Sequence, residues 1–231
     1  MDKLSTIQIV AISVLPFVFA ITVHEAAHGW VAKRLGDPTA QLMGRLTLNP
    51  IRHIDPVGTL LLPMVLLLLH SPFFFGWAKP VPIAWEKLKH PKRDIGLVAI
   101  AGPGANLLMG FFWALVMKIA TILPADSSYV AVPLMYMGFI GISINGMLMI
   151  LNMLPLPPLD GGRVLASLLP ARMGGVLRQI EQYGMLILIL LLISGLLGAI
   201  LLPPFFAYLA IIGWLFDIHA FMVALMQTFA N

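Results

Sequence analysis

Residues 4–32 read LSTIQIVAISVLPFVFAITVHEAAHGWVA, an apolar run in which Glu25 is the one charged side chain. An α-helix rises about 1.5 Å per residue, so a run of this length reaches across the roughly 30 Å hydrocarbon core of a bilayer. It is too long for a signal peptide and has no clear small-x-small cleavage site. We therefore expect a retained membrane helix, kinked near Pro16, that ends at Lys33 and Arg34.

The composition of the whole chain agrees with a membrane protein. Of its 231 residues, 60% are hydrophobic and 10% are charged, and the mean hydropathy is +0.96. A typical soluble domain has about 25% charged residues, so the composition excludes a water-soluble enzyme, a disordered segment and a nucleic-acid-binding module. The net charge of +4 comes from basic residues in loops between apolar runs, which is typical of membrane orientation. The chain has no cysteine, so any metal must bind His, Asp or Glu.

Further apolar runs follow, separated by Gly, Pro and charged residues: 57–69, 95–123, 129–154, 183–202 and 204–226. The first of these is too short to span a bilayer, and the aromatic, Gly- and Pro-containing stretch 73–82 after it favours an extended hairpin. We expect an all-α polytopic membrane protein with five to six membrane helices and a short re-entrant hairpin or β element. The chain is expected to be a single domain, with a core of about 1–180 and a C-terminal helical pair of about 181–231 that divides at Pro203-Pro204.

The Lys and Arg residues predict the orientation. Loop 33–56 holds four of them, loop 79–93 holds five, and the segment after Asp160 holds three. By the positive-inside rule these three segments are cytoplasmic. Because two of them flank residues 57–77, that stretch should enter from the cytoplasmic side and return, although an ordinary short spanning helix is the alternative.

The motif His24-Glu25-Ala26-Ala27-His28 interrupts the first membrane run. Two His residues at positions i and i+4 lie on one helix face, about 6 Å apart, and can bind the same zinc ion. A charged side chain in hydrocarbon costs about 2.5–3.5 kcal/mol, so a chance occurrence is disfavoured. Glu25 is placed to contact a water on that zinc.

A catalytic zinc takes three protein ligands and keeps one position open for water. The remaining candidates are His53, His70, His90, His219, Asp37, Asp55, Glu86, Asp94, Asp126, Asp160, Glu181 and Asp217. Most lie in loops or near run ends, where solvation explains them. Asp160 differs, because it closes a Pro-rich break whose irregular backbone near membrane depth indicates a protein-lined or wet cavity. His53 with Asp55 is a weaker candidate pair, since flanking prolines already explain a capped turn.

These motifs resemble the site-2 protease family of intramembrane zinc metalloproteases. The resemblance depends on two motifs, His24-Glu25-x-x-His28 and Asn152-x-x-Pro155-x-Pro157-x-Leu159-Asp160-Gly161. The second is one residue longer than in the family, because Pro158 fills an x. Residues 101–106, AGPGAN, resemble the central helix of the family, and residues 76–82, GWAKPVP, resemble its small, domain-less bacterial branch. The resemblance implies one zinc per chain, bound by His24, His28 and Asp160. It also implies that Glu25 is the general base and that Asn152 helps to hold the substrate carbonyl.

The remaining polar and small residues of the membrane runs have structural explanations. We expect Asn106 and Asn145 to bridge neighbouring helices by hydrogen bonds, and Gly102, Gly104 and Gly110 to allow close helix packing.

The predicted function is hydrolysis of a peptide bond in or near a transmembrane segment of a substrate protein. We expect a bacterial cell membrane location, an active site reached from the cytoplasmic side, no nucleic-acid partner, and a strand at 73–82 that pairs with the substrate. A membrane zinc hydrolase acting on lipid-modified substrates is one alternative, but it gives no reason for Asn152. A metal-binding transporter or scaffold is another. A transporter would need ionisable residues through both leaflets, and a scaffold would not need Glu25.

Overall fold

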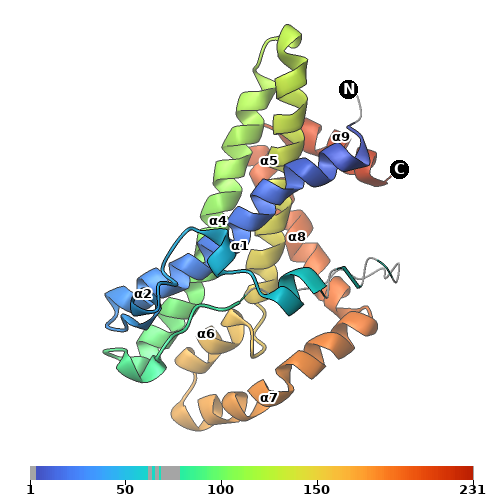
Figure 1. Cartoon of the computed structure of the whole chain (residues 1–231). Helices are drawn as coiled ribbons and strands as arrows, with labels where there is room; N and C mark the ends of the chain where they lie inside the picture. Colours follow the sequence, from blue (N-terminus) through green and yellow to red (C-terminus); the bar gives the residue numbers. More distant parts are fainter. Residues whose placement is uncertain (1–3, 62–63, 66–67, 69–78, 231) are drawn as a thin grey trace. The chain divides into compact units, whose positions relative to one another are not determined.

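The computed structural model describes residues 4–61, 64–65, 68 and 79–230, and these residues are mostly helical (Figure 1). The α-helices are α1 (Thr6–Arg34), α2 (Thr39–Leu42), α4 (Pro91–Thr121), α5 (Ser128–Asn152), α6 (Asp160–Leu168), α7 (Ala171–Ile193), α8 (Leu196–Leu215) and α9 (His219–Ala230). Short 3-10 or π turns occur at Pro50–Arg52, Pro56–Leu61, Trp85–Lys87 and Ala125–Ser127. No β-strand is assigned among the described residues, and residues 69–78, where most of the expected hairpin falls, lie outside them.

In the part of the chain that the structure describes, four helices are long and apolar enough to cross a membrane: α1 from Ile7, α4, α5 and α8. The apolar part of α7, Gln179–Ile193, is shorter. The expected number of five to six membrane helices is therefore not reached among the described residues. The all-helical class of the fold is confirmed.

The predicted division at Pro203-Pro204 is wrong, because both prolines lie inside α8. Membrane helices tolerate internal prolines when neighbouring groups satisfy the freed backbone. The chain turns instead at Gly195 and Asp217, which have positive φ angles of 76° and 52°. At Asp217 the following N–H of Ile218 bonds the carbonyl oxygen of Gly213 at 2.9 Å, which is the geometry of a left-handed helix end. The C-terminal region thus contains three helices rather than a pair.

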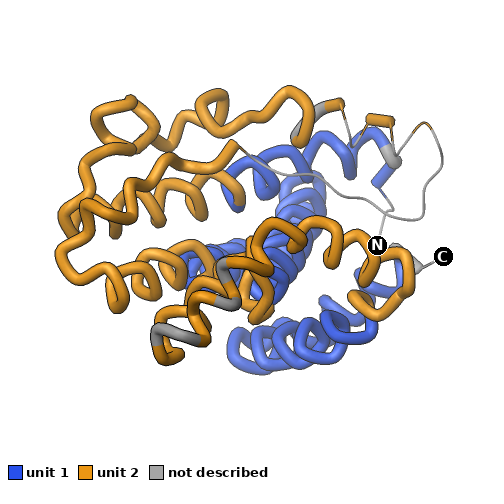
Figure 2. The backbone as a smooth tube through the Cα atoms, turned by 90° about the horizontal axis from the view of Figure 1, so that it is seen from below, with its two compact units in different colours: residues 1–20, 104–151, 199–231 blue, residues 21–103, 152–198 orange. Residues whose placement is uncertain are grey.

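The chain divides into two compact units (Figure 2). Unit 1 contains residues 1–20, 104–151 and 199–231, and unit 2 contains residues 21–103 and 152–198. Helices α1 and α4 each contribute one part to unit 1 and the other part to unit 2.

Unit 1 is held together by close packing of its helices. Side chains of Trp113 and Met117 from α4 and Tyr208 from α8 pack in its core, where glycines of α5 leave room for them. The buried Asn106 side chain donates to Oδ1 of Asn145 at 2.9 Å and to the carbonyl oxygen of Ala20 at 3.1 Å. The prediction that these two asparagines bridge neighbouring helices is confirmed.

Unit 2 brings the end of α1 next to the start of α4. Helix α1 ends at Arg34 and is followed by Gly36, whose φ of 114° favours glycine. The N–H of Asp37 closes the turn on the carbonyl oxygen of Ala32 at 2.9 Å. The N–H of Lys89 donates to the carbonyl oxygen of Leu35 at 3.1 Å. The residue after α1 and a residue just before α4 are therefore direct neighbours, although more than fifty positions separate them in the sequence.

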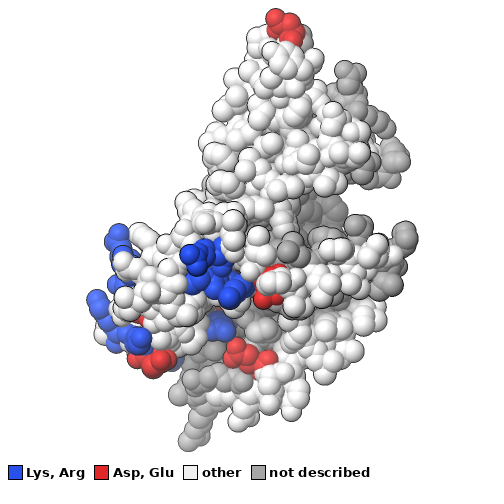
Figure 3. Space-filling view, viewed as in Figure 1, with Lys and Arg blue, Asp and Glu red and all other residues white. Residues whose placement is uncertain are grey.

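The charge of the chain is concentrated in unit 2. This unit holds every Lys and Arg of the sequence except Lys3 and Lys118. Figure 3 shows Lys and Arg gathered over the loops that follow α1 and precede α4.

Candidate metal centre

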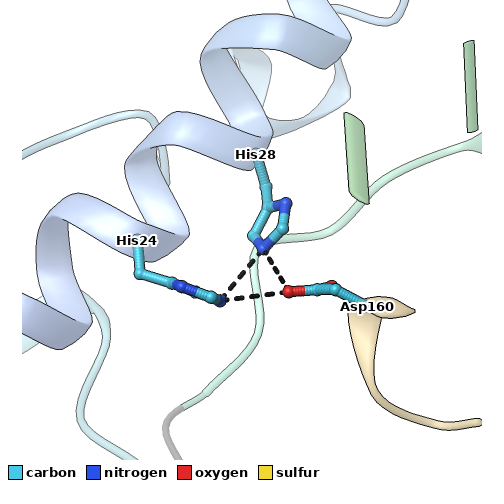
Figure 4. A group of neighbouring side chains, drawn as sticks. All are labelled: His24, His28 and Asp160. Carbon is cyan, nitrogen blue, oxygen red and sulfur yellow. Dashed lines mark hydrogen bonds and ion pairs between the residues drawn. The ribbon is translucent and has the colours of Figure 1, made fainter. Parts of the chain in front are cut away.

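Three side chains of unit 2 meet at one point, although two of them come from α1 and the third from α6 (Figure 4). The Nε2 atoms of His24 and His28 lie 3.1 Å apart. Oδ2 of Asp160 lies 3.4 Å from Nε2 of His24 and 3.2 Å from Nε2 of His28. Among the described residues, this is the group whose donor atoms could hold a metal ion, all within 4.8 Å of one another.

Helix α1 presents both imidazoles from one face, as the i and i+4 spacing predicts. Both are buried, with exposed fractions of 8% for His24 and 7% for His28. Nδ1 of His28 lies 2.7 Å from the carbonyl oxygen of Val98 in α4. A carbonyl oxygen only accepts, so a neutral His28 carries its proton on Nδ1 and its lone pair on Nε2, facing His24 and Asp160.

Asp160 is positioned by the Pro-rich segment that precedes it. The backbone of residues 153–157 folds back against Gly161 and Gly162, so closely that a Cβ atom at either glycine would overlap it. The peptide bond between Pro157 and Pro158 is cis. The two glycines thus let the loop turn sharply into α6, and Asp160 becomes the first residue of that helix.

Asp160 is an anion at neutral pH in this setting. Burial raises the pKa of its carboxyl group, but hydrogen bonds and positive charge from His24 and His28, when their imidazoles are protonated and no metal is bound, outweigh burial and lower the pKa to about 2. A carboxylate and two imidazole nitrogens form a donor set that zinc binds in catalytic sites, where a fourth position is left to water. The residues present therefore fit a zinc ion.

Gly102 of α4 borders this centre. A Cβ atom at Gly102 would lie 2.7 Å from Nε2 of His24 and would overlap Nε2 of His28. The sequence predicted a helix-packing role for Gly102, but its main neighbours in the structure are the two imidazoles. The sequence signal at this position was the stretch AGPGAN, residues 101–106. The resemblance did not indicate that this stretch lies beside His24 and His28.

Glu25 lies beside the centre without being one of the three converging ligands. Its Oε2 accepts a hydrogen bond of 2.8 Å from the backbone N–H of Val81, a contact that sequence reasoning did not anticipate. Asn152 is the last residue of α5, at the beginning of the Pro-rich segment, and its proposed contact with substrate stays a prediction.

The alternative pair of His53 and Asp55 has a structural role. Oδ1 of Asp55 accepts from the N–H groups of Val57 at 3.0 Å and Gly58 at 2.7 Å, which caps the following turn. Nε2 of His53 lies 2.9 Å from the carbonyl oxygen of Thr47. These contacts agree with the capped turn and not with a second metal site.

Comparison with known proteins adds independent evidence. The model of Peptidase family M50 matches residues 116–195, which include Asn152 and Asp160. A protein of Bacillus subtilis strain 168, named as zinc metalloprotease YwhC, is 38% identical over 192 residues, covering 82% of this chain and 84% of its own length. Proteins named as zinc metalloprotease Rip2 are similar over longer stretches. The one from Mycolicibacterium smegmatis is 28% identical over 93% of this chain and 76% of its own length, and the one from Mycobacterium tuberculosis H37Rv is 28% identical over 87% and 71%. No solved structure matches the chain significantly.

Proposed function

Because the chain belongs to the site-2 protease family, peptidase family M50, and is an intramembrane zinc metalloprotease, we propose that His24, His28 and Asp160 hold its zinc. We propose further that Glu25 is the general base of the reaction. The observation that carries this proposal is the convergence of two Nε2 atoms and one carboxylate oxygen within 4.8 Å, with Glu25 next to the first ligand in the chain. A lipid-directed hydrolase and a transporter are not favoured, since the relatives are named as metalloproteases.

The reaction is peptide hydrolysis. Zinc in this site supplies Lewis-acid chemistry, because it lowers the pKa of a water to about 7 and polarises the scissile carbonyl. Glu25 accepts the proton that the water loses as its oxygen bonds to the carbonyl carbon. Glu25 then donates this proton to the amine nitrogen as the C–N bond breaks. Val98 keeps the His28 ring in the tautomer that directs Nε2 toward the centre.

Asn152 is proposed to donate a hydrogen bond from its side-chain amide to the carbonyl oxygen as negative charge develops there. Its place at the end of α5, directly before the loop that positions Asp160, supports this role. The substrate class of the family is membrane proteins cleaved within the bilayer, and we propose a bond in or near a transmembrane segment. Of the strand expected at 73–82 to pair with the substrate, residues 73–78 lie outside the described residues. Pairing of 79–82 is not proposed, because the backbone donors of Lys79 and Val81 bind His53 and Glu25.

We propose that the site opens toward the cytoplasm of a bacterial cell and that residues 57–77 make no net crossing. Two observations support this. The end of α1 and the start of α4 are joined by the bond from Lys89 to Leu35, so the chain between them begins and ends at the same place in unit 2. The metal centre and nearly all basic residues also belong to this unit, as the positive-inside rule requires of the cytoplasmic end. Helices α1 and α4 run continuously through both units, which supports a single protease domain over 1–231.

The substitution Glu25→Gln tests the catalytic assignment. Gln has nearly the shape of Glu but cannot act as a base at neutral pH. The purified variant should keep about one zinc per chain, measured by elemental analysis, and should lose cleavage of a transmembrane-helix peptide that the wild-type protein cleaves. His24→Ala, which should lose zinc and cleavage together, is the comparison. Near-normal turnover by Glu25→Gln would show that another residue activates the water.

A further inference from the structure

Residues 79–84, KPVPIA, form a segment that unit 2 holds at both ends. The N–H of Lys79 donates to the carbonyl oxygen of His53 at 2.9 Å, and the N–H of Ala84 donates to Oδ2 of Asp37 at 2.7 Å. Lys79 and Val81 each precede a proline, which restricts both residues to extended backbone conformations. Val81, in the middle of the segment, therefore has little freedom to move.

Val81 supplies the single backbone hydrogen-bond donor of residues 80–82. Pro80 and Pro82 have no N–H, so Val81 carries the single amide hydrogen between Lys79 and Ile83. That N–H donates to Oε2 of Glu25 at 2.8 Å. A bond from a backbone amide to a carboxylate is charge-assisted and stronger than a bond between neutral groups.

The side chain of Val81 is docked on the same face of α1. Val81 is 6% exposed, and a Cβ atom at Gly29, four residues after Glu25, would lie 3.0 Å from its Cγ1. The missing side chain at Gly29 thus leaves a notch for Val81. An alanine at position 29 would require Val81 to shift by a few tenths of an ångström, and its Cβ atom would also lie 3.2 Å from Cβ of Ala40 and 3.3 Å from Cδ1 of Leu46.

We propose that Val81 is a positioning residue for the general base, with its N–H fixing one carboxylate oxygen of Glu25 and its side chain fixed in the notch at Gly29. The proposal rests on the catalytic role proposed above for Glu25. A free Glu side chain samples several rotamers, and a general base must stay within about 2.6–3.2 Å of the oxygen atom whose proton it removes. A misplacement of about 1 Å can cost about 100-fold in rate, so a fixed base raises kcat more than it changes substrate binding.

Hydrogen exchange measures the contact without zinc or substrate. Because Pro80 and Pro82 have no N–H, a proteolytic fragment covering 79–84 has only three amides after its first residue, those of Val81, Ile83 and Ala84. In chelator-treated protein, Glu25→Ala should make one more amide in this fragment exchange rapidly than in the wild-type protein. Unchanged exchange would mean that the N–H of Val81 is protected by something other than Glu25, and would overturn the proposal.

Kinetics test the functional part. Val81→Pro removes the N–H, whereas Val81→Ala keeps it and shortens the side chain, so the difference between the two variants isolates the hydrogen bond. With a transmembrane-helix peptide as substrate, Val81→Pro should keep about one zinc per chain and an unchanged KM, with kcat reduced about 100-fold relative to Val81→Ala. A kcat equal to that of Val81→Ala would overturn the proposal, and so would loss of zinc in step with activity, which would indicate a structural role.

A double substitution tests the notch. Gly29→Ala should lower kcat, because the new Cβ atom displaces Val81, and adding Val81→Ala should restore part of kcat by removing Cγ1. If kcat of the double variant were no higher than that of Gly29→Ala, the packing of Val81 against Gly29 would not affect Glu25, and this part of the proposal would be wrong. Failure here is distinguishable from failure of the proposed function, since an active Glu25→Gln variant would remove the need for a positioned base altogether.

Discussion

Gly102 of α4 lies so close to Nε2 of His28 of α1 that a Cβ atom at position 102 would overlap this nitrogen. The two residues belong to unit 2, and a Cβ atom at Gly102 would also approach Cε1 of His24 to 2.6 Å. The space beside the ligand nitrogens therefore depends on the absence of a side chain at this position.

Gly102→Ala should greatly reduce zinc content, because its methyl group would displace one or both imidazoles. Gly104→Ala is a matched control, since a Cβ atom at Gly104 meets no atom of the described residues within 4 Å and both glycines lie on the same helix. Elemental analysis of the purified variants should give about one zinc per chain for Gly104→Ala and much less for Gly102→Ala. Equal zinc in both would show that the imidazoles can move aside without losing the metal.

Removal of any single ligand should release the metal. Each of the variants His24→Ala, His28→Ala and Asp160→Ala leaves two of the three protein donors. A site with two donors binds zinc much more weakly than a site with three. Zinc content should fall from about one per chain toward zero in each variant, and far-ultraviolet circular dichroism should show retained helix. Full zinc retention in Asp160→Ala would refute its assignment as a ligand.

The sequence predicted which three side chains converge in the candidate metal centre, while their roles stay predictions. Spacing alone placed His24 and His28 on one helix face, and the Pro-rich break singled out Asp160 among twelve candidates. The contacts that orient these residues could not be read from spacing, because they come from backbone atoms distant in sequence: the carbonyl oxygen of Val98 and the N–H of Val81. A pattern of side-chain types carries little information about which backbone groups will meet them.

The ends of some helices could be predicted from the sequence, and the ends of others could not. The first three long apolar runs predicted α1, α4 and α5 within a few residues, because their ends are marked by charge, Pro or Gly. At the C-terminal end the pattern misled, since two adjacent prolines suggested a break inside what is α8. The actual turn at Gly195 depends on its left-handed backbone conformation, and a single glycine within an apolar run is a weak signal.

The packing of Gly110 against Tyr208 in unit 1 predicts that a substitution at one position restores the stability lost by a substitution at the other. A Cβ atom at Gly110 would overlap the hydroxyl oxygen of Tyr208, while the next ring atom, Cζ, would lie 3.3 Å away. Gly110→Ala should therefore lower stability by about 1–3 kcal/mol, the usual cost of overpacking, and adding Tyr208→Phe should recover most of the loss. The apparent melting temperatures of the two single variants and the double variant in detergent measure this coupling. Additive effects would mean that the hydroxyl group is not the obstacle.

Asp37 lies outside the candidate membrane helices, and its hydrogen bonds predict that the stability of the protein depends on pH. Burial raises its pKa, but hydrogen bonds from the Thr39 side chain and from the backbone N–H groups of Thr39 and Ala84 outweigh burial and lower the pKa below its ordinary value. A group with a lowered folded pKa stabilises the protein above its unfolded pKa of about 3.9, and this stabilisation is lost as the pH falls through the folded pKa. Asp37→Asn should therefore reduce stability by about 1–3 kcal/mol at pH 7, the range for hydrogen bonds to a charged group. Thermal unfolding of both proteins between pH 3 and 7 should show the difference shrinking below about pH 4, and a constant difference would contradict the assignment.

Cysteine labelling tests the orientation of the chain, since the natural sequence contains no cysteine. All three positions used here are exposed: Leu42 and His90 precede and follow residues 57–77 in the sequence, and Asp126 lies in the turn between α4 and α5. Leu42→Cys and His90→Cys should react with a membrane-impermeant maleimide in inside-out vesicles, and Asp126→Cys should react in right-side-out vesicles. The reason is the direct bond between Lys89 and Leu35, which places the residues flanking 57–77 at the same end of α1, together with the concentration of basic residues in unit 2. Reaction of positions 42 and 90 from opposite sides would mean that 57–77 crosses the membrane. The bond from Lys89 to Leu35 and the meeting of Asp160 with His24 and His28 would then be incompatible with the native membrane topology.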